Sequence, residues 1–229
     1  MVRSLREPTL SFLIRRAYSQ YGFVSAFIYG SQGEGKTTYA MWTLRYVYGS
    51  WEKATQYVFM DTKPLILTLK KAHEKGERIP AVLIDDAGKS LIKYSWGERG
   101  SIAFAILYNL MRSVCSGVLF TSVEATDIIK FVRDKVQYRV QVRRVSPEES
   151  VAVGYKVGYS PLLEPYVRRY FVDRYPLRLP DDVRAHLESI RRESVEETLQ
   201  SVLGSLERQR RKREELVDID EDEILSSLR

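Results

Sequence analysis

The chain has 229 residues, of which 44% are hydrophobic and 29% charged, so there is enough apolar material for a sizeable core and broad disorder is excluded. A single cysteine, Cys115, and two distant histidines, His73 and His186, exclude a disulfide framework and a cysteine- or histidine-rich metal site. The formal net charge is +6, and because residues 207–229 hold 6 basic and 8 acidic residues, the rest of the chain is more basic than the whole.

The first 145 residues alternate between apolar runs and amphipathic stretches. Residues 1–21 form an N-terminal segment with an amphipathic helix over 8–21. Buried strands are predicted at 23–29, 57–60, 81–84 and 117–121. Helices are predicted at 36–48, 62–74, 101–114 and 124–135. This alternation predicts an α/β fold over 22–145, with a mainly parallel sheet between two layers of helices.

The pattern changes after this core. Residues 138–142 and 151–157 alternate between polar and apolar, and the Ser-Pro-Glu-Glu connection at 146–149 makes them an antiparallel hairpin. Four prolines fall within twenty residues from Pro161 onward. We therefore expect the Pro-, Tyr- and Arg-rich remainder of 146–180 to be irregular.

Residues 181–229 predict a charged helical tail. An apolar stripe at helical spacing consists of Val195, Leu199, Val202 and Leu206. A basic block at 208–213 and an acidic block at 218–223 follow it. The stripe can dock on the core or pair with a partner helix.

A glycine-rich segment joins the first predicted strand to the next helix. It fits the phosphate-binding spacing G-x-x-x-x-G-K-[ST] and consists of Gly30, Ser31, Gln32, Gly33, Glu34, Gly35, Lys36, Thr37 and Thr38. Glycines let the backbone point successive N–H groups at a phosphate chain, and the helix N-terminus adds its dipole. Lys36 can bridge the β- and γ-phosphates while the Thr37 hydroxyl coordinates magnesium. We therefore predict a site for a nucleoside triphosphate and Mg²⁺.

Two carboxylates follow the strand predicted at 81–84. In a parallel sheet, ligands bind outside the carboxyl ends of the strands, so Asp85 and Asp86 should face the phosphate loop. We expect Asp85 to hold magnesium directly or through water, and Asp86 to orient the attacking water and act as base. The alternative is a pair of helix-capping aspartates.

Two hydroxyls, Thr121 and Ser122, follow at the end of the last strand of the predicted core. This is the place where a RecA-like or AAA+ ATPase puts a polar sensor, and a hydroxyl there can hydrogen-bond the γ-phosphate or the attacking water. Ser122 is equally suited to cap the helix that begins at Glu124. We therefore prefer Thr121 as the sensor.

Arg133 is the candidate for an arginine finger. It ends the helix that follows the sensor strand, from which an arginine can reach a neighbouring subunit's nucleotide. Arg99 and Arg112 are rivals. For each of the three, a solvated arginine at a helix end is the simpler interpretation.

These motifs together resemble an AAA+ or RecA-like ATPase core over about residues 20–145. Ile-Asp-Asp-Ala-Gly at 84–88 is similar to the DnaA/DnaC-like ATPases of archaeal viruses and plasmids. That resemblance implies ATP as the nucleotide, homo-oligomeric assembly on DNA, and a role in replication initiation or helicase loading. Two features depart from the family. Asp86 stands where AAA+ members usually carry glutamate, and neither a helical lid nor a helix-turn-helix is recognisable after the hairpin.

Basic and aromatic residues are interleaved over 133–178, a segment that contains 10 basic and 5 acidic residues. The aromatic residues are Tyr138, Tyr155, Tyr159, Tyr166, Tyr170, Phe171 and Tyr175. Basic residues beside aromatic rings suit a surface that binds DNA by phosphate contacts and base stacking. In the alternative, the rings pack this segment onto the core and the arginines are merely solvated.

The sequence thus predicts a Mg²⁺-dependent ATPase that assembles on or remodels DNA in a virus or plasmid. A DNA-translocating motor for packaging or transfer is an alternative, and so is a nucleotide switch or small-molecule kinase without a DNA role. No apolar run reaches the length of a membrane span and the start has no signal-peptide core, so we expect a location in the host cytoplasm and no membrane partner.

Overall fold

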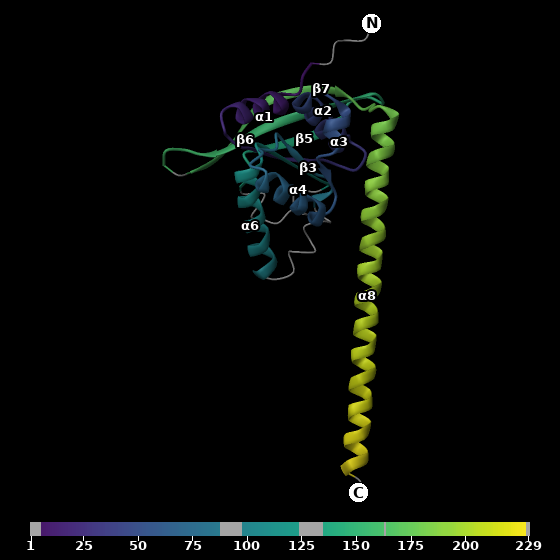
Figure 1. Ribbon diagram of the computed structural model, residues 1–229. Coiled ribbons are helices and arrows are strands. Elements are labelled where there is room, and N and C mark those ends of the chain that lie inside the picture. Colours follow the sequence, from purple (N-terminus) through teal and green to yellow (C-terminus); the bar gives the residue numbers. More distant parts are fainter. Residues whose placement is uncertain (1–5, 88–97, 124–134, 163, 228–229) are drawn as a thin grey trace. The chain divides into compact units, whose positions relative to one another are not determined.

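The computed structural model describes residues 6–87, 98–123, 135–162 and 164–227, apart from the side chains of 98–105, 201 and 208–227 (Figure 1). The chain divides into two compact units, residues 1–187 and residues 188–229. The described part of the second unit is the continuation of a single helix. None of the described helices is both long and apolar enough to cross a membrane.

A seven-stranded sheet forms the centre of the first unit. Its strands are β1 Val24–Tyr29, β2 Val58–Phe59, β3 Val82–Ile84, β4 Gly117–Ser122, β5 Tyr138–Arg144, β6 Glu149–Tyr159 and β7 Pro165–Pro176. Their order across the sheet is β2-β3-β4-β1-β5-β6-β7. The first five strands in this order are parallel, and β6 and β7 extend the sheet with antiparallel pairing. The structure confirms the mainly parallel α/β fold and the antiparallel hairpin.

Helices flank the sheet at nearly the predicted positions. They are α1 Thr9–Ser19, α2 Lys36–Tyr48, α3 Trp51–Thr55, α4 Thr62–Glu74, α6 Glu98–Val114 and α8 Asp181–Ser227. The sequence does not predict α3, because five residues are too few to show a helical period. Its start is marked only by Ser50, whose side chain accepts a hydrogen bond from the Lys53 N–H. The helix predicted at 124–135 lies outside the described residues except for Lys135.

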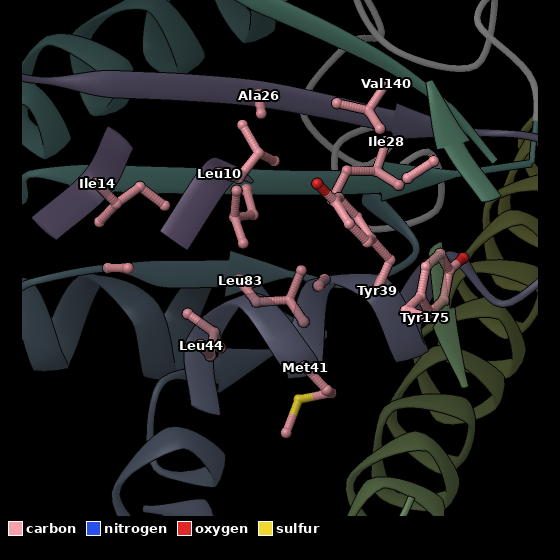
Figure 2. Close-up of a cluster of buried hydrophobic side chains, with 14 of the residues drawn as sticks. Leu10, Ile14, Ala26, Ile28, Tyr39, Met41, Leu44, Leu83, Val140 and Tyr175 are labelled. Atoms are coloured by element: carbon pink, nitrogen blue, oxygen red, sulfur yellow. The ribbon is translucent and has the colours of Figure 1, made fainter. Parts of the chain in front are cut away.

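The sheet has a hydrophobic core on each face. One core contains Leu10 and Ile14 of α1, Tyr39, Met41 and Leu44 of α2, and Ala26, Ile28, Leu83 and Val140 of the sheet (Figure 2). The other contains Leu65 and Leu69 of α4, Tyr108 and Met111 of α6, and Phe27, Val82 and Phe120 of the sheet. Because both faces of these strands are buried, their sequences are continuous apolar runs.

Strand β7 corrects the prediction of an irregular segment after the hairpin. Its twelve residues begin at Pro165 and end at Pro176, and it is the edge strand of the sheet. Prolines at the ends of an edge strand remove no hydrogen bond that the sheet interior requires. A register shift opposite Gly154 and Tyr155 also leaves Tyr170 as an extra residue, which breaks the polar–apolar alternation. These two features conceal the strand in the sequence.

The Asp173 carboxylate connects β7 to two helices. Its Oδ2 accepts hydrogen bonds from the backbone N–H of Thr9 at 2.8 Å and from the Tyr39 hydroxyl at 2.7 Å, and its Oδ1 accepts one from the Thr9 hydroxyl at 2.7 Å. Thr9 begins α1, so the carboxylate also complements the helix dipole. Burial raises the pKa of Tyr39 well above its ordinary value, and the Asp173 charge raises it further. The phenol therefore remains a donor.

Replacing Asp173 with alanine should destabilise the first unit, because the buried Tyr39 hydroxyl and the first N–H group of α1 lose their acceptor. We expect the free energy of unfolding to fall by about 2–4 kcal/mol and the thermal midpoint by roughly 5–15 °C. Circular dichroism on heating measures the change. The control is Asp182→Ala, which removes an exposed carboxylate, and equal midpoints for the two variants would contradict the prediction.

Candidate nucleotide-binding site

The phosphate-binding loop leaves β1 at Gly30 and enters α2 at Lys36. Gly33 and Gly35 have φ angles of 81° and 93°, in the left-handed region that favours glycine. Gly35 immediately precedes α2, whose first N–H groups have no acceptors within the helix. Gly30 lies so close to β5 that a Cβ atom there would be 2.5 Å from the Val142 carbonyl oxygen. The loop therefore has the backbone that a phosphate chain requires.

The Lys36 side chain folds back over this loop. Its Nζ donates hydrogen bonds to the carbonyl oxygens of Gly30 at 2.8 Å and Ser31 at 2.9 Å. Partial burial lowers the pKa of Lys36 below its ordinary value, while the charges of Asp85 and Asp86 act in the opposite direction. When a nucleotide occupies the loop, an ammonium group in this position can exchange its hydrogen bonds to these carbonyls for hydrogen bonds to the phosphate oxygens of the nucleotide.

The buried Asp85 carboxylate binds the hydroxyls of Thr37 and Thr121, and Thr121 in turn contacts Asp86. Its Oδ1 accepts a hydrogen bond from the Thr37 hydroxyl at 2.8 Å and one from the Thr121 hydroxyl at 2.6 Å. Thr121 Oγ1 in turn accepts the backbone N–H of Asp86 at 2.9 Å. The contacts arise because β4 lies between β1 and β3, so the residues that follow these three strands meet at one edge of the sheet.

Asp86 and Ser122 occupy the remaining predicted positions at this edge. Asp86 is half-buried and has a φ of 50°, a left-handed conformation that aspartate tolerates better than most residues. Ser122 is buried at the end of β4. The Thr121 hydroxyl donates to Asp85, and the sensor role of Thr121 stays a prediction.

Residues of the antiparallel part of the sheet, strands β5 to β7, form hydrogen bonds with the phosphate loop. The Tyr175 hydroxyl donates to the Gly35 carbonyl at 3.0 Å, and the Ser150 hydroxyl donates to the Glu34 carbonyl at 2.8 Å. The Glu34 carboxylate accepts the backbone N–H of Arg144. Burial raises the pKa of Tyr175, so its phenol remains a donor. Sequence reasoning missed these contacts, because no local pattern connects residues more than one hundred positions apart.

Of the three arginine candidates, the structure describes the side chain of Arg112, and it lies away from this site. Arg112 places its guanidinium 5.9 Å from the ring centroid of Phe23, which precedes β1 at the opposite end from the loop. Arg133 and the side chain of Arg99 lie outside the described residues. The finger assigned to Arg133 stays a prediction.

The donor set fits a triphosphate with magnesium. Thr37 and Asp85 bring a hydroxyl and a carboxylate oxygen within 2.8 Å of each other, and Mg²⁺ prefers such hard oxygen ligands. No group of three or more His, Cys, Asp or Glu side chains that could hold a metal occurs in the described part of the chain.

The chain is related to proteins of archaeal viruses. It is 31% identical over 211 residues to "Uncharacterized protein B-251" of Sulfolobus spindle-shape virus 1, and the alignment covers 84% of each chain. It therefore belongs to the family of that viral protein. It is also 25% identical over 183 residues to "Uncharacterized protein ORF286" of Acidianus two-tailed virus, covering 78% of this chain and 62% of that one. No protein-family model matches the chain.

Two solved structures resemble this chain, each at low sequence identity. The N-terminal domain of zonular occludens toxin from Neisseria meningitidis matches with a TM-score of 0.39 and 13% identity, over 66% of this chain and 95% of that one. A KaiC-like protein from Pyrococcus horikoshii matches with a TM-score of 0.31 and 14% identity, over 66% and 93%. The viral relatives agree with the predicted resemblance to archaeal virus proteins. The DnaA/DnaC-like type stays a prediction.

Replacing Tyr175 with phenylalanine should weaken nucleotide binding, because the loop loses the hydrogen bond on the Gly35 carbonyl while the ring stays packed 5.1 Å from that of Tyr39. We expect the affinity for a fluorescent triphosphate analogue to fall about 2- to 13-fold. Tyr48→Phe is a matched control, since its phenol donates to the Ala81 carbonyl, away from the loop. Equal losses of affinity in both variants would show that the Tyr175 contact has no specific effect.

Proposed function

We propose that this protein is a Mg²⁺-dependent ATPase whose hydrolysis serves work on DNA. The observation that supports the ATPase is the Asp85 carboxylate, which accepts hydrogen bonds from both Thr37 and Thr121. Thr37 follows the phosphate loop and Thr121 is the second-to-last residue of the neighbouring strand β4, so one buried carboxylate connects the nucleotide-binding loop to the sensor position. This connection favours hydrolysis over nucleotide binding alone.

Each residue has a distinct part in the proposed reaction. The loop N–H groups and Lys36 bind the triphosphate, and Lys36 balances the charge that develops on its phosphates. Thr37 and Asp85 would hold Mg²⁺, which supplies Lewis acidity to the phosphate oxygens when bound. Asp86 orients the attacking water and accepts its proton, and the Thr121 hydroxyl detects the γ-phosphate. The preference for ATP over GTP follows from the resemblance to AAA+ ATPases.

Substitutions should separate binding from hydrolysis. Lys36→Ala should abolish both nucleotide binding and hydrolysis. Asp86→Asn should retain nucleotide binding. Thr121→Val should lower turnover about 100-fold or more at nearly unchanged nucleotide affinity. Removing Mg²⁺ with a chelator should stop phosphate release by the wild type. The control is Thr68→Val on α4, whose hydroxyl donates only to a local backbone carbonyl. Full turnover in Lys36→Ala or Asp86→Asn would contradict the assignment.

DNA is the proposed partner because the segment 133–178 is basic and part of it is exposed. Tyr138, Phe171 and Tyr175 are buried, so packing accounts for these three rings. Tyr159, Tyr166 and Tyr170 are instead 63%, 41% and 52% exposed. A DNA surface within this segment is therefore supported at the exposed rings and not along its whole length.

Assembly into homo-oligomers in viral replication is part of the same proposal. In the second unit, an apolar stripe of Val195, Leu199, Val202 and Leu206 is exposed along α8. Such a stripe can pair with a partner helix, either of another copy or of a replication protein. The finger role of Arg133 belongs to this assembly, since a finger acts on the nucleotide of a neighbouring subunit.

ATP turnover should rise when DNA is added. We expect stimulation by at least one of single-stranded and double-stranded DNA, measured as phosphate release, together with a larger particle mass in the presence of a slowly hydrolysed ATP analogue. Turnover that is the same with and without DNA would contradict the DNA role and leave the ATPase proposal intact. Transfer of the γ-phosphate to a small molecule in place of water would indicate a kinase.

A further inference from the structure

The far ends of β6 and β7 form a hairpin arm, described here over residues 155–162 and 164–170. The last residue of β6 that pairs with β5 is Lys156, opposite Tyr138, and the Val157 N–H then bonds to the Gln137 carbonyl. Beyond that point the two strands pair only with each other, as far as Tyr159 opposite Pro165. Figure 1 shows this hairpin extending past α1. Its surfaces are thus available to a partner.

One face of the arm has an unneutralised pair of like charges. Lys156 and Arg168 lie directly opposite each other across the two strands, and both are exposed. Among the described residues, neither side chain is in an ion pair with a carboxylate. Like charges at directly opposite positions destabilise a sheet, so this pair costs stability unless an anion binds it. The arm holds one acidic residue, Glu164, in its turn.

Aromatic rings lie on the two sides of this charge pair. Tyr166 and Arg168 alternate along β7, and alternate residues of a strand share a face, which here also carries Lys156 opposite Arg168. Tyr170 is the extra residue at the register shift, and its ring lies beside Tyr138, which is paired opposite Lys156. The Tyr166 ring lies across Gly158, where an added Cβ atom would be 2.8 Å from the ring. The Tyr170 ring is centred 5.8 Å from that of Tyr138 and remains 52% exposed. Each ring is therefore supported on one side by the protein while part of it remains accessible.

We propose that this arm face, formed by Lys156, Tyr166, Arg168 and Tyr170, binds single-stranded DNA. The two cations contact phosphates and the two rings stack on bases, an arrangement that tolerates any sequence. A single strand is specified because bases in a duplex already stack on one another and offer no free face. The inference rests on the proposed DNA role and assigns it a surface and a strand type.

Fluorescence anisotropy with a labelled oligonucleotide of about 16 nucleotides, in the absence of ATP, tests the arm directly. Tyr166→Ala and Tyr170→Ala should each weaken binding roughly tenfold, and Tyr166→Phe should bind like the wild type. The double variant Lys156→Gln with Arg168→Gln should lower the slope of log affinity against log salt by about 1.4. A duplex of the same sequence should bind more weakly than the single strand.

Two matched controls define the alternative outcomes. Phe12→Ala removes a 53% exposed ring from α1, and Lys63→Gln removes an exposed cation from α4. Wild-type affinity in both tyrosine variants, or losses equal to that of Phe12→Ala, would overturn the proposal. Loss of self-association without any strand binding would also overturn it and assign the arm to a second copy. Because no ATP is present, an inactive ATPase does not affect this result.

Discussion

A carboxylate is costly to bury without hydrogen-bond donors, and the nucleotide site depends on how Asp85 obtains them. The hydroxyls of Thr37 and Thr121, which come from different parts of the chain, both donate to it. Both can reach one oxygen only because β4 lies between β1 and β3 in the sheet. The phosphate loop, Asp85 and Thr121 therefore meet at one edge of the sheet for three reasons together. These are the strand order, the parallel direction of the strands and the length of each apolar run.

A second constraint on the phosphate loop comes from β6 and β7. Glycines make the loop able to wrap phosphates, but the same freedom leaves it without a preferred shape. The hydroxyls of Ser150 and Tyr175 restrict that freedom by donating to two successive loop carbonyls. Ser150 on β6 pairs with Tyr175 on β7, and β7 is in turn held to α1 and α2 through Asp173. The antiparallel extension is thus part of the nucleotide site, although its residues lie far from the phosphate-binding motif in the sequence.

The parts of this structure that could be predicted are those with a local signature. The loop at 30–38 and the strand leading to Asp85 each combine an apolar run with a fixed motif, so both their structure and their chemistry follow from neighbouring residues. Strand β7 has no such signature, because prolines bound it and the extra residue Tyr170 interrupts its alternation. The contacts of Asp173 and Tyr175 depend on pairing across more than one hundred residues, which a single sequence does not encode locally.

The irregularity at Tyr170 also explains how one strand can contribute to two sites. On one side of the register shift, Phe171 packs into the core, and Asp173 and Tyr175 contact α1, α2 and the loop. On the other side, the residues from Tyr166 to Tyr170 lie on the arm. A bulge re-aims side chains without interrupting the chain of paired residues. A nucleic-acid strand on the arm would therefore contact the same β-strand that supports Gly35, about five residues and roughly 17 Å away, without an intervening loop.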